Sequence, residues 1–281
     1  MKVIILTSKG GLSDLTIYGN NLLEQLKQEF DVKIFDTINS DFSNVTDLFD
    51  DIHKLVLFNQ FSIPGAFETF TKYLPSFRNI KFLLSPYSMY KGLDLELLKS
   101  MNIHYRNNAG ANAKSVAQYD ITAMFMLLSK FPIFSKEMVM PEGTILGEEY
   151  HKKTAGIIGM GNVGKELLNI LNDLKISTVY NNRSEENVSA KKVSLEEIFQ
   201  QDIIFISIAT NEETIELLKD LPDLIQDKNY IIDGTAVDQL YDKKKVVDLL
   251  NQDRLRGYAV ELFDPGKLKL VSEKNLIATP H

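Results

Sequence analysis

The sequence contains no cysteine, and this absence narrows the chemistry that the protein can perform. Without thiols there is no disulfide, no thiolate nucleophile and no cysteine-ligated metal. Histidine is also scarce: the four histidines stand at positions 53, 104, 151 and 281, and no two have the i, i+4 spacing of a helical zinc site. We therefore expect no metal site.

Long apolar runs are missing as well, and none approaches the length of a membrane-spanning helix. The opening residues, MKVIILT, are too few for a signal peptide and predict a buried strand instead. Basic stretches are short, and the formal net charge of −7 argues against a nucleic-acid partner. We interpret the densest basic run, Lys243 to Lys245, as the solvated face of a helix. These observations predict a cytoplasmic protein that binds neither membranes nor nucleic acids.

What the sequence does contain is typical of globular proteins, with 44% hydrophobic and 25% charged residues, and 281 residues suffice for two domains. In the first part, short apolar strands alternate with helical segments, which predicts a parallel sheet covered on both faces. The expected strands are residues 2–6, 32–35, 55–58, 80–84 and 103–105, and the expected helices include 21–30 and 94–101. We assign residues 1–105 to one α/β domain.

The alternation continues in the second part and predicts a doubly wound α/β domain over residues 106–281. A long, largely apolar helix is expected at 113–131, followed by a loop at 132–147. The expected strands are residues 154–159, 176–180, 203–207, 230–233, 257–263 and 276–278.

Three glycines, Gly159, Gly161 and Gly164, form the pattern GxGxxG between the strand at 154–159 and an amphipathic helix. In this setting Gly159 makes a tight turn, Gly161 lets bare backbone approach a pyrophosphate, and Gly164 lets the helix pack closely on the strand. The alternative is a glycine-rich turn without a ligand, but the flanking strand and helix favour a dinucleotide site. The backbone amides expected to face the pyrophosphate, at the positive end of the helix dipole, are those of Asn162 and Val163.

The residues after the next strand indicate which dinucleotide is bound, because in NAD-binding domains an Asp or Glu there holds the ribose hydroxyls. This chain has Asn182, Arg183 and Ser184 instead. The planar guanidinium of Arg183 suits a 2′-phosphate, so we favour NADP(H), with NAD(H) possible. In the alternative interpretation, Arg183 is a solvated loop residue beside Glu185 and Glu186.

The order of these elements, together with several short motifs, resembles the D-isomer-specific 2-hydroxyacid dehydrogenases. The resemblance covers most of the chain and rests on motifs at residues 94–96 with Ile103 and Asn107, 108–118 (NAGANAKSVAQ), 154–164, 207–214 (SIATNEET) and 279–281 (TPH). The resemblance implies a flavodoxin-like substrate domain, a Rossmann-type cofactor domain and a homodimer that pairs through the cofactor domain.

The resemblance also implies site residues. His281 matches the family's catalytic base, and an imidazole suits proton transfer near neutral pH. Asp264 lies in a loop that is shorter than the family's. It is the candidate for the carboxylate that keeps this imidazole charged and oriented. Glu261 either accepts a hydrogen bond from the nicotinamide amide or is a polar residue at a strand end. The remaining cofactor positions are Ala209 and Thr210, on the adenine side, with Gly234 and Thr235.

The substrate-binding residues depart from the family pattern. In the family, an arginine binds the substrate carboxylate. Ala236 stands at or beside the position of this arginine, and no arginine lies nearby in the sequence. The family's glycine-bearing turn is replaced by a segment that includes Tyr87, Ser88 and Lys91, and Lys91 is either a replacement cation or a solvated lysine. The sequence also stops at His281, without the family's tail that returns to the substrate domain, so it is either truncated or closes differently.

We therefore expect an NAD(P)-dependent dehydrogenase or reductase that acts on a CH–OH group, transferring hydride between the nicotinamide and a small 2-hydroxy or 2-oxo acid. Two alternatives stay open, and the missing arginine motivates both. One is a catalytically impaired NADP(H)-binding sensor or partner-binding protein, and the other is a dehydrogenase for a substrate without a carboxylate.

Overall fold

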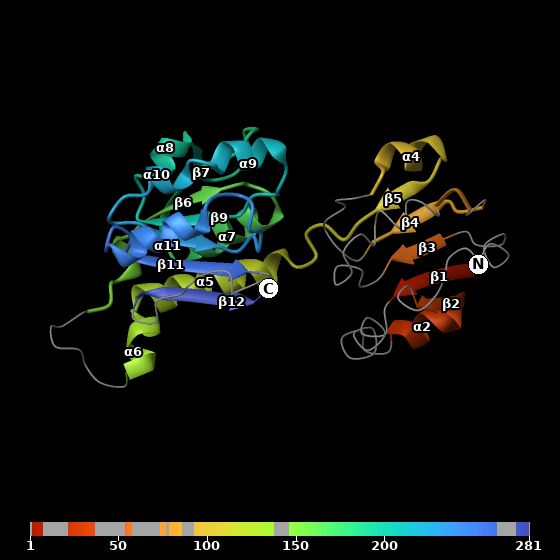
Figure 1. Cartoon of the computed structure of the whole chain (residues 1–281), viewed down its shortest axis with the longest axis horizontal. Coiled ribbons are helices and arrows are strands. Elements are labelled where there is room, and N and C mark those ends of the chain that lie inside the picture. The colour runs from red at the N-terminus through yellow and green to blue at the C-terminus, as the bar shows by residue number, and fades with distance from the viewer. Residues whose placement is uncertain are drawn as a thin grey trace. The chain divides into compact units, whose positions relative to one another are not determined.

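The structure is a computed structural model, and it describes residues 2–7, 22–36, 54–57, 74–76, 79–85, 93–137, 146–262 and 274–280. The chain divides into two compact units, Met1–Ala111 and Asn112–His281 (Figure 1). The sequence analysis placed the division between residues 105 and 106. Within the described residues, no helix combines the length and the apolarity needed to cross a membrane.

The first unit contains a five-stranded sheet in which all neighbouring strands are parallel. Its order is β2-β1-β3-β4-β5, which is the flavodoxin-like order and confirms the fold predicted for this part of the chain (Figure 1). The strands are β1 (Lys2–Thr7), β2 (Asp31–Asp36), β3 (Lys54–Leu57), β4 (Phe82–Leu84) and β5 (His104–Arg106).

In the described part of this unit, two α-helices and one 3-10 turn accompany the sheet: α2 (Leu22–Glu29), α4 (Leu95–Ser100) and η3 (Leu74–Ser76). The carboxylate of Asp94 accepts the backbone N–H of Leu97 at 2.9 Å, which satisfies one of the free amides at the start of α4. Helix α2 presents Leu23 to Ile5 of β1, and both side chains are buried. Helix and strand therefore share an apolar contact in this unit.

The second unit contains a seven-stranded parallel sheet in the order β12-β11-β10-β9-β6-β7-β8. Counted from β6, this is the Rossmann order 3-2-1-4-5-6 extended by one strand, which confirms the predicted Rossmann-type fold. The strands are β6 (Thr154–Ile158), β7 (Ser177–Asn181), β8 (Lys191–Lys192), β9 (Ile203–Ile206), β10 (Tyr230–Asp233), β11 (Gly257–Leu262) and β12 (Leu276–Pro280). The sequence analysis missed β8, because two lysines carry no apolar pattern.

Helices cover both faces of this sheet (Figure 1). Helices α5 (Ala113–Leu128) and α7 (Asn162–Asp173) cover one face. The other face is covered by α8 (Leu195–Ile198), α9 (Glu212–Leu218), α10 (Leu221–Leu224) and α11 (Lys243–Asn251). Along β9, Phe205 packs toward the first face, whereas Ile204 and Ile206 pack toward the second. Because both faces are covered, the strand is a continuous apolar run rather than an alternating one.

Three predictions about the helices were wrong. Part of the expected loop at 132–147 is helical, as α6 (Phe131–Glu137), and Pro132 is tolerated because it occupies the first turn, where no intrahelical amide bond is lost. Helix α5 ends earlier than expected, and Lys130 takes a positive φ of 58° between α5 and α6. Lys243 is 5% exposed rather than solvated, because its ammonium group pairs with buried Asp233.

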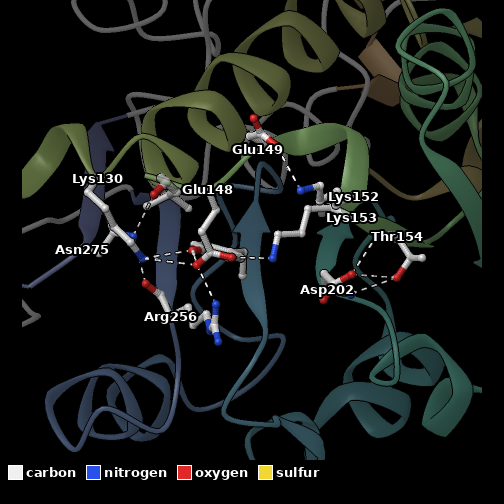
Figure 2. Close-up of polar contacts among 11 residues, drawn as sticks. Lys130, Glu148, Glu149, Lys152, Lys153, Thr154, Asp202, Arg256 and Asn275 are labelled. Carbon is white, nitrogen blue, oxygen red and sulfur yellow. Dashed lines mark hydrogen bonds and ion pairs between the residues drawn. The ribbon is translucent and has the colours of Figure 1, made fainter. Parts of the chain in front are cut away.

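A network of charges around Glu148 lies where β10 and β11 begin (Figure 2). Glu148 Oε1 accepts from Tyr230 Oη and from Arg256 Nη1, both at 2.6 Å, while Lys153 pairs with the other carboxylate oxygen. Burial raises the pKa of Glu148, but the hydrogen bonds from Lys153, Tyr230 and Arg256 outweigh it and lower the pKa to about 2. Lys130 is buried and donates to Tyr230 Oη at 3.0 Å. The carboxylate of Glu148 therefore connects α6, and the region of the short 3-10 turn η4 (Tyr150–Lys152), to the sheet.

We expect Glu148→Ala to lower the free energy of unfolding by roughly 1–3 kcal/mol, because it leaves the buried hydroxyl of Tyr230 without an acceptor. Since the folded pKa is lower than the ordinary value, this contribution is present above pH 4.5 and is lost as the pH falls toward about 2. Urea unfolding at several pH values measures both effects. The matched control is Glu149→Ala, whose exposed ion pairs should contribute less than about 1 kcal/mol. Equal losses for the two variants would contradict this role of Glu148.

Candidate functional site

The turn between β6 and α7 contains the three glycines of the GxGxxG pattern. Gly159 has φ +96°, and a Cβ atom there would lie 2.4 Å from the carbonyl oxygen of Ser207. Its N–H donates to the carbonyl oxygen of Asn181 at 2.8 Å. The turn therefore touches the ends of β7 and β9, which flank β6. This is the point where the strand order reverses, and ligands of doubly wound folds bind at such points.

Gly161 and Gly164 differ in what a side chain would meet. A Cβ atom at Gly164 would lie 2.1 Å from the carbonyl oxygen of Gly159, so α7 packs against the turn at a distance that only glycine permits. A Cβ atom at Gly161 would meet nothing within 4 Å, so the backbone there faces open space. Glycine at 164 is explained by packing, whereas glycine at 161 is not. The open side of Gly161 is where a ligand can approach the backbone.

Helix α7 begins without a side-chain cap, because its N-cap residue is Gly161. The first backbone bond of the helix runs from Lys165 N to Gly161 O at 3.0 Å, so the preceding amides have no intrahelical acceptor. These amides include those of exposed Asn162 and half-buried Val163. Free amides and the positive end of a helix dipole together suit a diphosphate, and the residues present therefore fit the predicted group.

The tip of β7 is linked to the same turn. Asn182 Oδ1 accepts from Met160 N at 3.4 Å, and Asn182 Nδ2 donates to the carbonyl oxygen of Ser184 at 3.2 Å. The carboxylate of Glu186 accepts from Ser184 Oγ at 3.0 Å and from Lys165 Nζ at 2.9 Å. The bonds from Lys165 and Ser184 lower the pKa of Glu186. An acidic side chain thus stands beside the predicted 2′-phosphate position, and its charge is offset by Lys165.

Arg183 lies at the outermost point of this tip. Its side chain is 86% exposed and pairs with exposed Glu213 at 3.0 Å. Lys192 Nζ donates to the carbonyl oxygen of Arg183 at 3.0 Å and places a second cation beside the tip. Such an exposed ion pair is weak, so the guanidinium is available to an anionic ligand.

The loop after β9 holds the predicted adenine-side residues Ala209 and Thr210. Ala209 is exposed and Thr210 is half-buried. Thr214 Oγ1 donates to the carbonyl oxygen of Ala209 at 2.8 Å, while Asn211 caps α9 through a capping box. The loop is therefore tied to the start of α9, at the same edge of the sheet as the glycine turn.

At the end of β10, Asp233 is completely buried and organises the residues that follow it. Its Oδ1 accepts from both the N–H (3.0 Å) and the hydroxyl (2.6 Å) of Thr235, while Oδ2 accepts from Tyr241 Oη at 2.5 Å and pairs with Lys243. Burial raises the pKa of Tyr241 well above its usual value, so the phenol donates. The bend formed by Gly234 and Thr235 is thereby held next to the ends of β9 and β11.

Sequence analysis missed one acidic residue at this edge. Asp120 on α5 is 1% exposed, and a Cβ atom added to Gly234 would lie 2.3 Å from Asp120 Oδ1. Its neighbour Tyr119 makes a hydrogen bond of 2.7 Å with Thr279 Oγ1 on β12, and half-buried Glu261 lies on β11 in register with Thr279. The signal available in the sequence was a single acidic residue inside an otherwise apolar helical segment.

The predicted catalytic and substrate-binding residues lie outside the described part of the chain. These residues are His281, Asp264, Lys91, Tyr87 and Ser88. Ala236, at or beside the position of the family's arginine, is described: it is 1% exposed and has φ 54°. The methyl side chain at this position is therefore buried and carries no charge.

An extended 3-2-1-4-5-6 sheet, with a glycine turn and an uncapped helix at its switch point, defines the second unit as a Rossmann-type dinucleotide fold. A family model described as "D-isomer specific 2-hydroxyacid dehydrogenase, NAD binding domain" matches residues 121–281. The chain belongs to the D-isomer specific 2-hydroxyacid dehydrogenase family. The family predicted from its sequence motifs is therefore confirmed.

Individual relatives are distant. Formate dehydrogenase of Arabidopsis thaliana is 26% identical over 202 residues, which are 67% of this chain and 52% of the relative, so the match spans about half of the relative's length. A D-isomer specific 2-hydroxyacid dehydrogenase from Lactobacillus delbrueckii ssp. bulgaricus, solved in an NAD complexed form, superposes with a TM-score of 0.77 at 15% identity, covering 100% of this chain and 90% of that one.

A second solved structure is the NADPH-dependent glyoxylate/hydroxypyruvate reductase from Sinorhizobium meliloti in complex with NADP and malonate. It superposes with a TM-score of 0.74 at 17% identity, covering 100% of this chain and 86% of that one. At such identities the likeness of both structures concerns the fold.

The different surroundings of Gly161 and Gly164 predict different outcomes for two alanine variants. Gly164→Ala should lower the free energy of unfolding by roughly 1–3 kcal/mol, because its Cβ overlaps the backbone of Gly159. Gly161→Ala should change it by less than about 1 kcal/mol, yet weaken dinucleotide binding by at least about tenfold, because its methyl group fills the space that a diphosphate requires. Thermal unfolding and calorimetric titration measure the two properties, and unchanged dinucleotide affinity in Gly161→Ala would contradict the assignment of this turn.

Proposed function

We propose that this protein is an NAD(P)-dependent oxidoreductase that transfers a hydride between a nicotinamide dinucleotide and a small 2-hydroxy or 2-oxo acid. The observation that carries the proposal is the open backbone at Gly161, at the start of a helix without a side-chain cap. Membership in the 2-hydroxyacid dehydrogenase family supports the choice of reaction. When bound, the nicotinamide supplies or accepts the hydride.

The roles of the protein's own residues follow from the family resemblance. In the reducing direction, His281 donates a proton to the substrate's carbonyl oxygen as the hydride arrives at the carbon. Asp264 holds the imidazole in its charged form and in the required orientation. We propose Lys91 as the cation that replaces the family's arginine in binding the substrate carboxylate, with Tyr87 and Ser88 as further substrate-binding residues.

We propose NADP(H) as the preferred cofactor. The support comes from exposed Arg183 and from Lys192 beside it, two cations at the tip of β7. Glu186 stands nearby but is paired with Lys165, so its charge opposes a 2′-phosphate only weakly. NAD(H) is the alternative, with Asn182 and Glu186 accepting from the ribose hydroxyls.

A dehydrogenase for a substrate without a carboxylate is the second candidate. Ala236 supplies no cation, and Lys243 is paired with Asp233. The described carboxyl ends of β10 and β11 therefore present acidic rather than basic groups, which favours a neutral or cationic substrate. The sensor alternative has less support, because the relatives compared above are named as dehydrogenases or a reductase.

A homodimer that pairs through the second unit is also proposed. The large apolar side chains exposed in the described part of this unit, taken as an isolated chain, include Phe125 (38%), Phe131 (52%) and Leu146 (72%), and they support such a contact. A cytoplasmic location remains an expectation from the sequence.

We expect the purified protein to oxidise NADPH in the presence of at least one small 2-oxo acid, and His281→Ala to lower kcat by roughly 10²- to 10⁴-fold. The loss of absorbance at 340 nm across a panel of 2-oxo acids and of ketones without a carboxylate measures this. The matched control is His151→Ala, which removes an exposed histidine and should retain full activity. Activity on the ketones alone would favour the second candidate, and a flat trace with every compound would contradict both.

Cofactor choice is tested by Arg183→Ala. We expect the Kd for NADPH to rise by on the order of tenfold while the Kd for NADH stays the same, because only NADPH carries the phosphate that the guanidinium faces. The matched control is Arg254→Ala, which removes another exposed arginine, paired with Asp227 away from the tip. An equal change in both Kd values, or none in either, would show that Arg183 does not select the cofactor.

A further inference from the structure

Asp120 is a buried acid whose hydrogen-bonding capacity is unused. Its side chain is 1% exposed, and neither carboxyl oxygen has a hydrogen-bond partner within the described part of the chain. A buried carboxylate without donors is costly, and such groups in native proteins usually have a partner. Packing alone does not account for an acid at this point of an apolar helix.

The elements that pack against Asp120 bring further acidic groups and no free cation among the described residues. Helix α5 contacts β10, β11 and β12. The titratable groups that face Asp120 from these elements are Asp233 and Glu261, and Tyr119 lies beside it on α5 itself. Lys243 is already paired with Asp233. Burial, followed by the charges of Asp233 and Glu261, raises the pKa of Asp120 to about 8.

The position of Asp120 in the fold connects this acid to the cofactor. The glycine turn at the end of β6 marks the middle of an extended dinucleotide, and the tip of β7 marks its adenosine end. The opposite half of the sheet, β9 to β12, therefore receives the nicotinamide end. Asp120 packs on Gly234, directly after β10, at that half of the carboxyl edge.

We propose that Asp120 is a positioning residue that acts as a proton-linked counter-charge for the nicotinamide ring. Its carboxyl group is ionised beside the oxidised cofactor and protonated beside the reduced one. The inference rests on the proposed function. The oxidised ring carries a positive charge that the reduced ring lacks, so only the oxidised form favours the ionised carboxylate. Binding of the oxidised cofactor then releases the proton of Asp120 to solvent, and the relative affinity for the two forms depends on pH.

The first experiment measures Kd for NADP⁺ and for NADPH between about pH 7 and about pH 9.5, above the ordinary histidine pKa of about 6.5. In the wild type, the ratio of Kd for NADP⁺ to Kd for NADPH should fall by on the order of tenfold as the pH rises. In Asp120→Asn, which is isosteric and always neutral, the ratio should stay constant within about twofold. The matched control is Asp248→Asn, which removes an exposed carboxylate from α11 and should reproduce the wild-type dependence.

The outcomes separate this inference from the proposed function. If neither form of the cofactor binds, both fall together. If both bind but the wild-type ratio is flat, or if Asp120→Asn keeps the wild-type dependence, the counter-charge is overturned and the oxidoreductase assignment stands.

A second experiment uses the wild type alone and does not depend on the folding of a variant. Calorimetric titrations near pH 8, in buffers of different ionisation enthalpy, measure the number of protons released on binding. Asp120 is about half protonated there, so NADP⁺ should release roughly half a proton and NADPH should take up roughly half, a difference of about one proton. The 2′-phosphate is common to both ligands and cancels in the difference. Equal release for the two forms overturns the proposal.

Discussion

The structure of the second unit depends on one close approach of backbone to backbone. The carbonyl oxygen of Gly159 lies where a side chain at residue 164 would begin, so strand β6, the turn and helix α7 fit together only because Gly164 has no Cβ. The positive φ of Gly159 turns the chain between the ends of β7 and β9. This constraint directs the uncapped start of α7 toward the switch point of the fold.

Charge is distributed unevenly between the two ends of this sheet. Where β10 and β11 begin, one carboxylate, Glu148, is surrounded by hydroxyl, ammonium and guanidinium donors (Figure 2). Such a satisfied network holds the segment that precedes β6. Where the same strands end, three acidic residues lie close together: Asp120, Asp233 and Glu261. Within the described residues, the cation beside them is Lys243, which pairs with Asp233. The first end is satisfied by the protein itself, whereas the second retains an unused acid, which is the condition expected of a site that acquires its partner on binding.

Much of the fold could be predicted from the sequence, because strand and helix periodicities are local. The strands of both units and the long helix α5 were expected within a few residues of their observed bounds. The exceptions have physical explanations. The two-residue strand β8 has no apolar pattern. Pro132 is typical of a loop, although proline also suits the first turn of a helix. The Lys243–Asp233 pair was missed, because a run of three lysines is solvated in most helices and only the fold brings one of them to a buried carboxylate.

The sequence by itself determined the order of elements, the family and the glycine turn, since each depends on residues that are adjacent in the chain. It also identified Asn182, Arg183 and Ser184 as the tip of β7, but not that Glu186 and Lys165 neutralise each other beside it. Only the tertiary structure decided which charges are buried and which have partners. Asp120 lies on a helix far from Gly234 in the sequence, and folding brings its carboxyl group against that glycine. Burial and electrostatic environment are properties of such long-range contacts, and local sequence patterns do not encode them.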